Sequence, residues 1–283
     1  MQVKKIADIK GAQDGAIWGD ELFRFDDTGR FWVYDISEIF QGAPKLLGEF
    51  MIEGRDKIIP HSNSVCFGFE YYSPEDEYPL LYSNVYNNYA KCEDQLIGVL
   101  VAYRIKRLAD RYTATPVQLI RIGFCEDEAL WKMSAEAHGP RPYGNFVVDR
   151  DKKELWAFVM RNKELGTRYF RFAMPTVKEG ELDAKTGLKC RVLGKDEILS
   201  SFDCSYHHYL QGACFYEGKI YSTEGFGSEN NPSAIRVIDP QKQEEKYFNF
   251  MEMDICDEPE MVDFHKGKCI YSDAHGKVFQ LDF

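Results

Sequence analysis

The sequence lacks an apolar run near the roughly 20 residues that a membrane-spanning helix needs. Its first residues, MQVKKIADIKGAQDG, do not contain the apolar core of a secretory signal. Positive charge is scarce as well, because 35 Lys and Arg stand against 46 Asp and Glu, for a net charge of -11. Such a surface repels phosphate groups, and no basic stripe offsets this. We therefore expect a cytoplasmic protein with neither a nucleic-acid nor a membrane partner.

Paired cysteines and two hydrolase motifs are also missing. The eight cysteines fall singly, with no Cys-x-x-Cys pair, and Cys66, Cys214 and Cys269 lie in apolar runs. We expect them to be reduced, because a buried thiol acts as a small hydrophobe. No Gly-x-Ser-x-Gly elbow supports a serine hydrolase. The stretch GFGSENNP after Glu224 has no Lys-Ser/Thr pair to hold a phosphate, so it is expected to form a rim loop.

What the sequence does contain is a repeat of short strand-like segments. Five of them share one register: AQDGAIW, HSNSVCF, YGNFVVD, LQGACFY and PEMVDFH. Each precedes a turn and a second strand, and these read LFRFD, LLYSN, LWAFV, IYSTE and CIYSD. Third strands follow in every unit and fourth strands in four, the stretch Cys190 to Leu193 being the fourth strand expected for unit three. Repeated four-stranded units of this length are typical of β-propeller blades, whereas a β-sandwich would not explain the shared register.

The last unit predicts how the ring closes. It stops after its third strand, KVFQLD, while the segment Val3 to Ile9 precedes the first unit without another assignment. Pairing the two would complete the fifth blade and remove an open sheet edge. We therefore predict an all-β, five-bladed propeller in which the N-terminal strand pairs with the last blade.

The whole chain, residues 1–283, is expected to form this single domain. The predicted blades span about residues 10–55, 60–125, 142–205, 209–251 and 258–283, with strand 3–9 added to the last. Two insertions interrupt them. Glu126 to His138 has acidic residues in its first turn and predicts a short helix, and the charged segment Val177 to Asp203 is expected to extend blade three.

One position of each inner strand is polar in all five units, and the inner strands of a propeller line its axis. These residues are Asp14, Asn63, Asn145, Gln211 and Glu260, and each carries a side-chain oxygen. The last positions of the second strands are Asp26, Asn84, Val159, Glu224 and Asp273. We expect both sets at the same end of the channel. Nearby loops add further candidates for ligand binding: His61, Arg141, Tyr143, Arg161, His207, His208, Asn230 and His275.

A ring of oxygen ligands with two carboxylates suits a hard cation, Ca²⁺ above all, and offers no thiolate or imidazole for zinc. The inner-strand ring resembles that of the calcium-dependent propeller hydrolases, which include six-bladed lactonases and five-bladed calcium-activated nucleotidases. This resemblance implies an axial Ca²⁺ held by Asp14, Asn63, Asn145, Gln211 and Glu260. The mixed ring departs from the nucleotidase pattern, which speaks against nucleotide hydrolysis. A water-filled channel is the alternative interpretation.

The inner carboxylates are also similar to those of the five-bladed glycosidases. That resemblance implies a general acid and a base or nucleophile facing each other across a funnel. Asp14, Asp26, Glu224, Glu260 and Asp273 are available for these roles. Separation decides between them, and sequence does not give it.

Two adjacent histidines follow a cysteine in FDCSYHHYLQG. The run from Cys204 to His208 could bind a transition metal, or supply a base beside His61. Its spacing matches no zinc motif, and a capping role in the loop is the favoured alternative.

We therefore predict that a small polar, carbohydrate-like molecule is bound, or hydrolysed or otherwise cleaved, in the axial funnel. The candidate catalytic residues are His61, His208, Glu224 and Asp14. The alternative is a non-catalytic scaffold for protein interactions, because propellers host enzymes and scaffolds alike.

Overall fold

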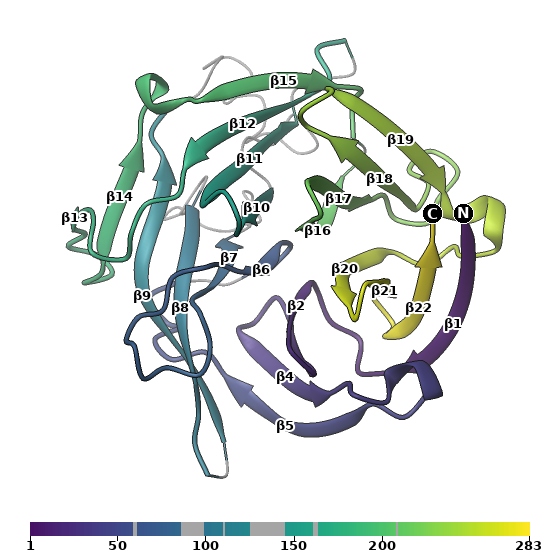
Figure 1. Ribbon diagram of the computed structural model, residues 1–283, viewed down its shortest axis with the longest axis horizontal. Coiled ribbons are helices and arrows are strands. Elements are labelled where there is room, and N and C mark those ends of the chain that lie inside the picture. The colour runs from purple at the N-terminus through teal and green to yellow at the C-terminus, as the bar shows by residue number, and fades with distance from the viewer. Residues whose placement is uncertain (59–60, 86–98, 110, 125–144, 161–163, 208) are drawn as a thin grey trace.

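A computed structural model describes residues 1–58, 61–85, 99–109, 111–124, 145–160, 164–207 and 209–283. These residues form five sheets around a central axis, with the inner strands converging at the centre (Figure 1). The chain is therefore a five-bladed β-propeller, as the repeat predicts. No helix within the described ranges is long and apolar enough to cross a membrane.

Four of the sheets have four strands, numbered from the axis outward. Blade one contains β2 (Gly15–Trp18), β3 (Glu21–Phe25), β4 (Arg30–Asp35) and β5 (Lys45–Met51). Blade three contains β10 (Asn145–Asp149), β11 (Glu154–Met160), β12 (Thr167–Ala173) and β15 (Ser200–Cys204). Blade four contains β16 (Leu210–Tyr216), β17 (Lys219–Glu224), β18 (Ala234–Asp239) and β19 (Glu244–Asn249). Blade five contains β20 (Pro259–His265), β21 (Lys268–Asp273), β22 (Lys277–Asp282) and β1 (Gln2–Asp8).

The composition of blade five confirms the predicted closure. Strand β1 pairs antiparallel with β22, from Gln2 opposite Asp282 to Asp8 opposite Lys277. The two ends of the chain consequently lie side by side (Figure 1). The first segment of the chain thus covers the edge that β22 would otherwise expose.

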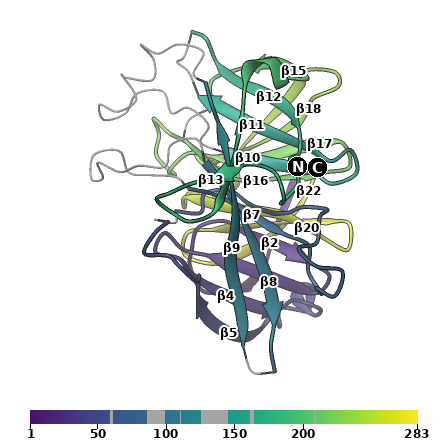
Figure 2. The same cartoon turned by 90° about the vertical axis from the view of Figure 1, so that its left-hand side faces the viewer.

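Blade two is larger than expected. Its strands are β6 (Val65–Phe67), β7 (Leu81–Val85), β8 (Val99–Arg107), β9 (Tyr112–Ile122), β14 (Lys189–Leu193) and β13 (Glu181–Leu182). In both views the far ends of β8 and β9 extend away from the body of the blade (Figure 1, Figure 2). The predicted helix Glu126 to His138 lies outside the described residues.

The sequence assignment of the strand near Cys190 was wrong. Strand β14 pairs in parallel with β9, Lys189 opposite Gln118, and so belongs to blade two. Blade three takes its outer strand from β15, which pairs with β12. The insertion thus crosses to the neighbouring blade before it returns, which short-range periodicity does not reveal because the pairing joins residues about 70 positions apart.

Tight turns and aromatic contacts set the shape of the blades. The hairpin β16–β17 turns at Glu217 and Gly218, whose φ angles of 46° and 77° are those of a primed two-residue turn. Between blades one and two, Phe23 meets Phe67 and Tyr78 edge-on, with ring centroids 5.4 Å apart in both pairs. Burying such rings stabilises the interface between blades by about 1.5–3 kcal/mol for each side chain.

Three short 3₁₀ turns complete the described secondary structure: η1 (Ile39–Gln41), η2 (Lys195–Glu197) and η3 (Phe250–Met253). All three lie outside the inner strands. The axis is therefore lined by strands and by the segments that lead directly into them.

Candidate functional site

The five inner-strand polar residues lie together on the axis, and all are buried, with exposed fractions of 0–5%. We call Asp14, Asn63, Asn145, Gln211 and Glu260 the axial cluster. Hydrogen bonds join its members across blades, since the Asn63 amide donates to Gln211 Oε1 at 3.4 Å. The Asn145 amide donates to the backbone oxygen of Gln211. The shared register thus brings residues from five sheets to one level.

Asp14 shows how these side chains replace missing strand neighbours. Its Oδ2 accepts the backbone N–H of Val65 at 2.7 Å, although Val65 begins the inner strand of the next blade. Burial raises the pKa of the Asp14 carboxyl well above its usual value, and this hydrogen bond lowers it in part. The carboxyl therefore ties blade one to blade two while one oxygen remains available.

The axis is narrow at this level. A Cβ placed on Gly212, in β16, would lie 2.8 Å from Asp14 Oδ1 and would overlap the carbonyl oxygen of Glu260. Only glycine leaves space for these neighbours. The inner strands of blades four, five and one therefore approach too closely here to leave an open channel between them.

Several oxygens at the axis are buried and accept no hydrogen bond from the described residues. These atoms are Asp14 Oδ1, Asn63 Oδ1, Asn145 Oδ1, Glu260 Oε2 and Asp273 Oδ2. A buried acceptor without a donor costs about 1–3 kcal/mol. The set is thus suited to a species that donates hydrogen bonds or carries positive charge.

A buried arginine, which sequence reasoning missed, lies beside these acceptors. Arg24 of β3 is fully buried, and its Nη2 donates to the backbone oxygens of Ala12 at 2.8 Å and Asp273 at 3.0 Å. Burial lowers the pKa of the guanidinium, while the carboxylates of Glu260 and Asp14 oppose that effect. The signal was available in LFRFD, where an arginine interrupts an apolar second strand.

The mouth of the axis holds a chain of polar side chains that are only partly buried. His61 Nε2 lies 3.2 Å from Gln13 Oε1, and the Gln13 amide donates to Glu260 Oε1 at 3.1 Å. On the other side the Gln211 amide donates to Glu258 Oε1 at 2.6 Å. Gln13 and Glu258 were not among the predicted residues, because a single polar residue beside a strand carries no distinctive pattern.

Asp273 and His275 sit at the same end but serve different purposes. Asp273 Oδ1 accepts the backbone N–H groups of His275 and Lys277, at 3.0 and 2.9 Å, and so shapes the turn between β21 and β22. Burial raises the pKa of the Asp273 carboxyl. The His275 ring is largely exposed and lies 3.6 Å from Asp257 Oδ1.

Further along β20, Asp263 provides a second carboxyl on the axis that sequence reasoning missed. Its Oδ2 accepts the backbone N–H of Ile17 at 2.7 Å, which links blade five to blade one. Burial raises the pKa of Asp263 to about 6. This group therefore changes charge in a mildly acidic range.

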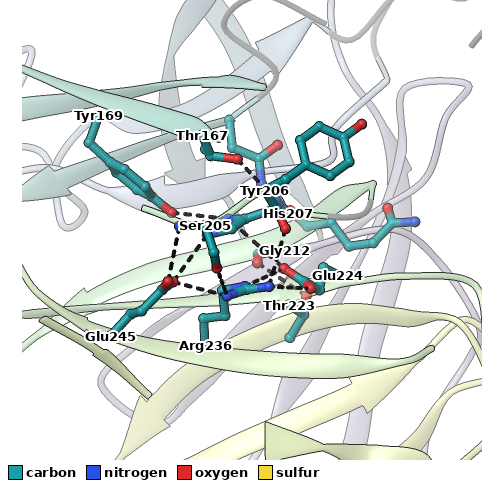
Figure 3. A network of polar contacts seen from close by, with 12 residues as sticks. Thr167, Tyr169, Ser205, Tyr206, His207, Gly212, Thr223, Glu224, Arg236 and Glu245 are labelled. Carbon is teal, nitrogen blue, oxygen red and sulfur yellow. Dashed lines mark hydrogen bonds and ion pairs between the residues drawn. The ribbon is translucent and has the colours of Figure 1, made fainter. Parts of the chain in front are cut away.

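Glu224 and His207 belong to a different cluster, between blades three and four (Figure 3). Glu224 receives Arg236 Nε at 2.7 Å and Nη2 at 3.1 Å. Arg236 Nη1 also donates to Glu245 at 2.9 Å. His207 is fully buried, and its Nδ1 lies 3.2 Å from the Tyr169 hydroxyl. We call these five residues the interblade network.

Four of the predicted site residues, Arg141, Tyr143, Arg161 and His208, lie outside the described residues. Among the others, the contacts above join His61, Asp14, Asn63, Asn145, Gln211 and Glu260 at one end of the axis. The site is thus a polar cluster on the axis of a five-bladed propeller, with a mouth formed by His61, Gln13 and Glu258.

Comparison with known proteins adds little to this description. No family model matches the chain. It is 26% identical over 160 residues to the DNA replication complex GINS protein SLD5 of Candida glabrata, which covers 54% of this chain and 50% of that protein. The chain thus spans about half the length of this curated protein.

Solved structures with a similar course of the chain have low TM-scores. Hydrazine synthase of Kuenenia stuttgartiensis gives 0.41 with 11% identity, over 92% of this chain and 61% of that one. BamB of Moraxella catarrhalis gives 0.35 with 12% identity, over 95% and 69%. Sqt1 of Saccharomyces cerevisiae gives 0.35 with 10% identity, over 92% and 54%. The five-bladed architecture rests on the strand pairing itself.

Proposed function

We propose that the protein binds a small, hydroxyl-rich molecule of the carbohydrate class at the axial cluster. The observation that carries this proposal is the set of five buried oxygens without donors. Hydroxyl groups would supply those donors, and each satisfied acceptor would recover part of its desolvation cost. The ligand would enter at the mouth, where His61, Gln13 and Glu258 are only partly buried.

Arg24 favours a neutral ligand over a divalent cation. Its guanidinium already places a positive charge beside Glu260, Asp14 and Asp273. It also donates to a thioether, Met261 Sδ at 3.7 Å, which is a weak acceptor. One N–H at Nε has no partner among the described residues, so Arg24 could also donate to a ligand oxygen.

The direct test is isothermal titration calorimetry with D-glucose, D-galactose and myo-inositol. Glu260→Gln keeps the shape of the side chain and an oxygen for Gln13, but it replaces an acceptor by an NH₂ group. We expect the affinity for the bound sugar to fall about 10- to 100-fold, because a buried acceptor is lost. Glu252→Gln, at an exposed carboxyl of η3, is the matched control and should bind normally.

An axial Ca²⁺ is the second candidate, because the atoms without donors are all oxygens, the ligands that Ca²⁺ prefers. In that case Ca²⁺ would raise the melting temperature of chelator-treated protein. The double variant Asp14→Asn/Glu260→Gln would lose the increase. A Ca²⁺ response without sugar binding would favour this candidate, and the absence of both responses would favour the scaffold.

Hydrolysis is the catalytic form of the same proposal. Burial raises the pKa of both Asp14 and Glu260, which suits a general acid, and His61 at the mouth is the available base. Turnover of chromogenic glycosides that is lost in His61→Ala, with sugar binding retained, would support catalysis. Binding without turnover would assign the axis to recognition alone.

A further inference from the structure

Three side chains with different metal-binding chemistry meet beside the interblade network. They are the Cys204 thiol at the end of β15, the His207 imidazole in the following segment and the Glu245 carboxylate on β19. Their ligand atoms all lie within 4.8 Å of one another. Cys204 belongs to blade three and Glu245 to blade four, so the cluster joins two blades.

His207 Nε2 is the atom that this packing leaves without a hydrogen-bond partner. The ring is fully buried, and Nε2 accepts and donates no hydrogen bond among the described residues. Its distance of 3.7 Å to Glu245 Oε2 is too long for a hydrogen bond. Two ligands of one tetrahedral zinc ion, with bonds of roughly 2.0–2.3 Å, are separated by about 3.5 Å. The observed spacing therefore matches a pair of zinc ligands.

The surrounding contacts hold the ligands in position. Tyr169 lies 3.2 Å from His207 Nδ1, and a proton on Nδ1 that is donated to this hydroxyl leaves the lone pair of Nε2 directed into the cluster (Figure 3). Glu245 Oε1 accepts the backbone N–H of Ser205 at 3.0 Å. Oε2 accepts Arg236 Nη1 at 2.9 Å and has a second lone pair to offer.

The charges of the interblade network also favour a cation. Two carboxylates, Glu224 and Glu245, face one guanidinium, that of Arg236, and Glu224 already forms two hydrogen bonds with it. When a metal binds, the Cys204 S–H bond breaks, the proton passes to solvent and the sulfur–metal bond forms. A divalent cation then balances one thiolate and the Glu245 carboxylate.

We propose that Cys204, His207 and Glu245 bind one Zn²⁺ ion, which holds blade three to blade four and keeps a fourth coordination position open to water. Mixed sulfur, nitrogen and oxygen ligands suit zinc, whereas Ca²⁺ takes oxygen alone. This site is separate from the axial cluster and does not depend on what binds there.

The experiment adds Zn²⁺ or Co²⁺ to the chelator-treated full chain. We expect one ion for each molecule, a higher melting temperature with Zn²⁺, and a sulfur-to-cobalt charge-transfer band with Co²⁺. Cys204→Ser should abolish the band. Cys256→Ser, at an exposed cysteine, should retain it. Glu245→Gln should weaken zinc binding, whereas Glu244→Gln on the same strand should not.

Tyr169→Phe gives a readout that a merely structural cysteine would not show. Loss of an outer contact to a ligating histidine typically lowers metal affinity about 10- to 100-fold. We expect a loss of that size for zinc with the charge-transfer band preserved. A chain that binds no Co²⁺, or whose charge-transfer band survives in Cys204→Ser, would overturn the proposal.

Discussion

Two buried arginines in this propeller have opposite surroundings. Arg236, in the interblade network, donates from Nε, Nη1 and Nη2 to two carboxylates, a serine hydroxyl and a backbone oxygen. Arg24, on the axis, donates to two backbone oxygens and a thioether and has an unpartnered Nε. The carboxylates raise the pKa of Arg236, whereas burial lowers that of Arg24.

The difference separates a structural contact from a binding site. The Arg236–Glu224 pair satisfies both charges and joins neighbouring strands of blade four. The region around Arg24 instead contains acceptors without donors, which is a costly arrangement for stability alone. Underpaired polar groups of this kind gather at functional sites, so the axis is the region to probe for ligands.

The largest effect is expected from breaking the saturated pair. Arg236→Met would leave Glu224, with 1% of its side chain exposed, as an uncompensated buried charge. We expect a loss of about 3–5 kcal/mol in the free energy of unfolding, measured by urea denaturation. The double variant Arg236→Met/Glu224→Met should recover most of it. An Arg236→Met protein as stable as the wild type would show that the pair contributes little.

Acid titration should distinguish the two regions next. Burial raises the pKa of Asp263 from 3.8 to about 6. Its protonated form is the one that the fold favours, so the stability it contributes is complete below pH 3.8 and is lost as the pH rises to about 6. A change of this size corresponds to about 3 kcal/mol. Asp263→Asn should flatten this part of the curve of stability against pH.

Glu245 should show the opposite dependence. Its pKa is lowered, against the effect of burial, by contacts with His207, Ser205 and Arg236. The stability that this carboxylate contributes is present above pH 4.5, its ordinary pKa, and is lost as the pH falls. Glu245→Gln should remove that loss on acidification in metal-free protein, as followed by thermal melts between pH 3 and 7. The same slope in Glu244→Gln and wild type would complete the control.

Much of this architecture could be predicted from the register of the five inner strands. It located Asp14, Asn63, Asn145, Gln211 and Glu260 together, because equivalent positions in repeated blades face one axis. The end of a second strand was a weaker guide, since Glu224 pairs with Arg236 on the neighbouring strand of its own blade. Side-chain pairing across a sheet depends on the partner strand, which a single-segment pattern does not contain.

Contacts between distant segments were beyond sequence reasoning for the same reason. The parallel pairing of β14 with β9 moved an expected strand of blade three into blade two. The cluster of Cys204, His207 and Glu245 required two blades to be placed side by side. A Cys-x-x-His run alone supplies two ligands, and the third came from a strand about 40 residues away.

The smallest stability effect is expected at the axial arginine. Arg24→Met would leave the backbone oxygens of Ala12 and Asp273 without these donors while removing a buried charge, so we expect a net loss of about 1–3 kcal/mol. Urea denaturation at pH 5 and pH 8 should show a larger loss at pH 8, where Glu260 and Asp14 ionise further without the guanidinium. A loss larger than that of Arg236→Met would break the comparison.

The most direct measurement is a high-resolution crystal structure of the protein grown with a sugar identified by calorimetry. The account predicts one bound molecule at the mouth of the axis, with hydroxyl groups donating to at least three of the oxygens of Asp14, Asn63, Asn145, Glu260 and Asp273. Ordered waters that satisfy all of these oxygens, with the sugar absent or bound elsewhere, would contradict it.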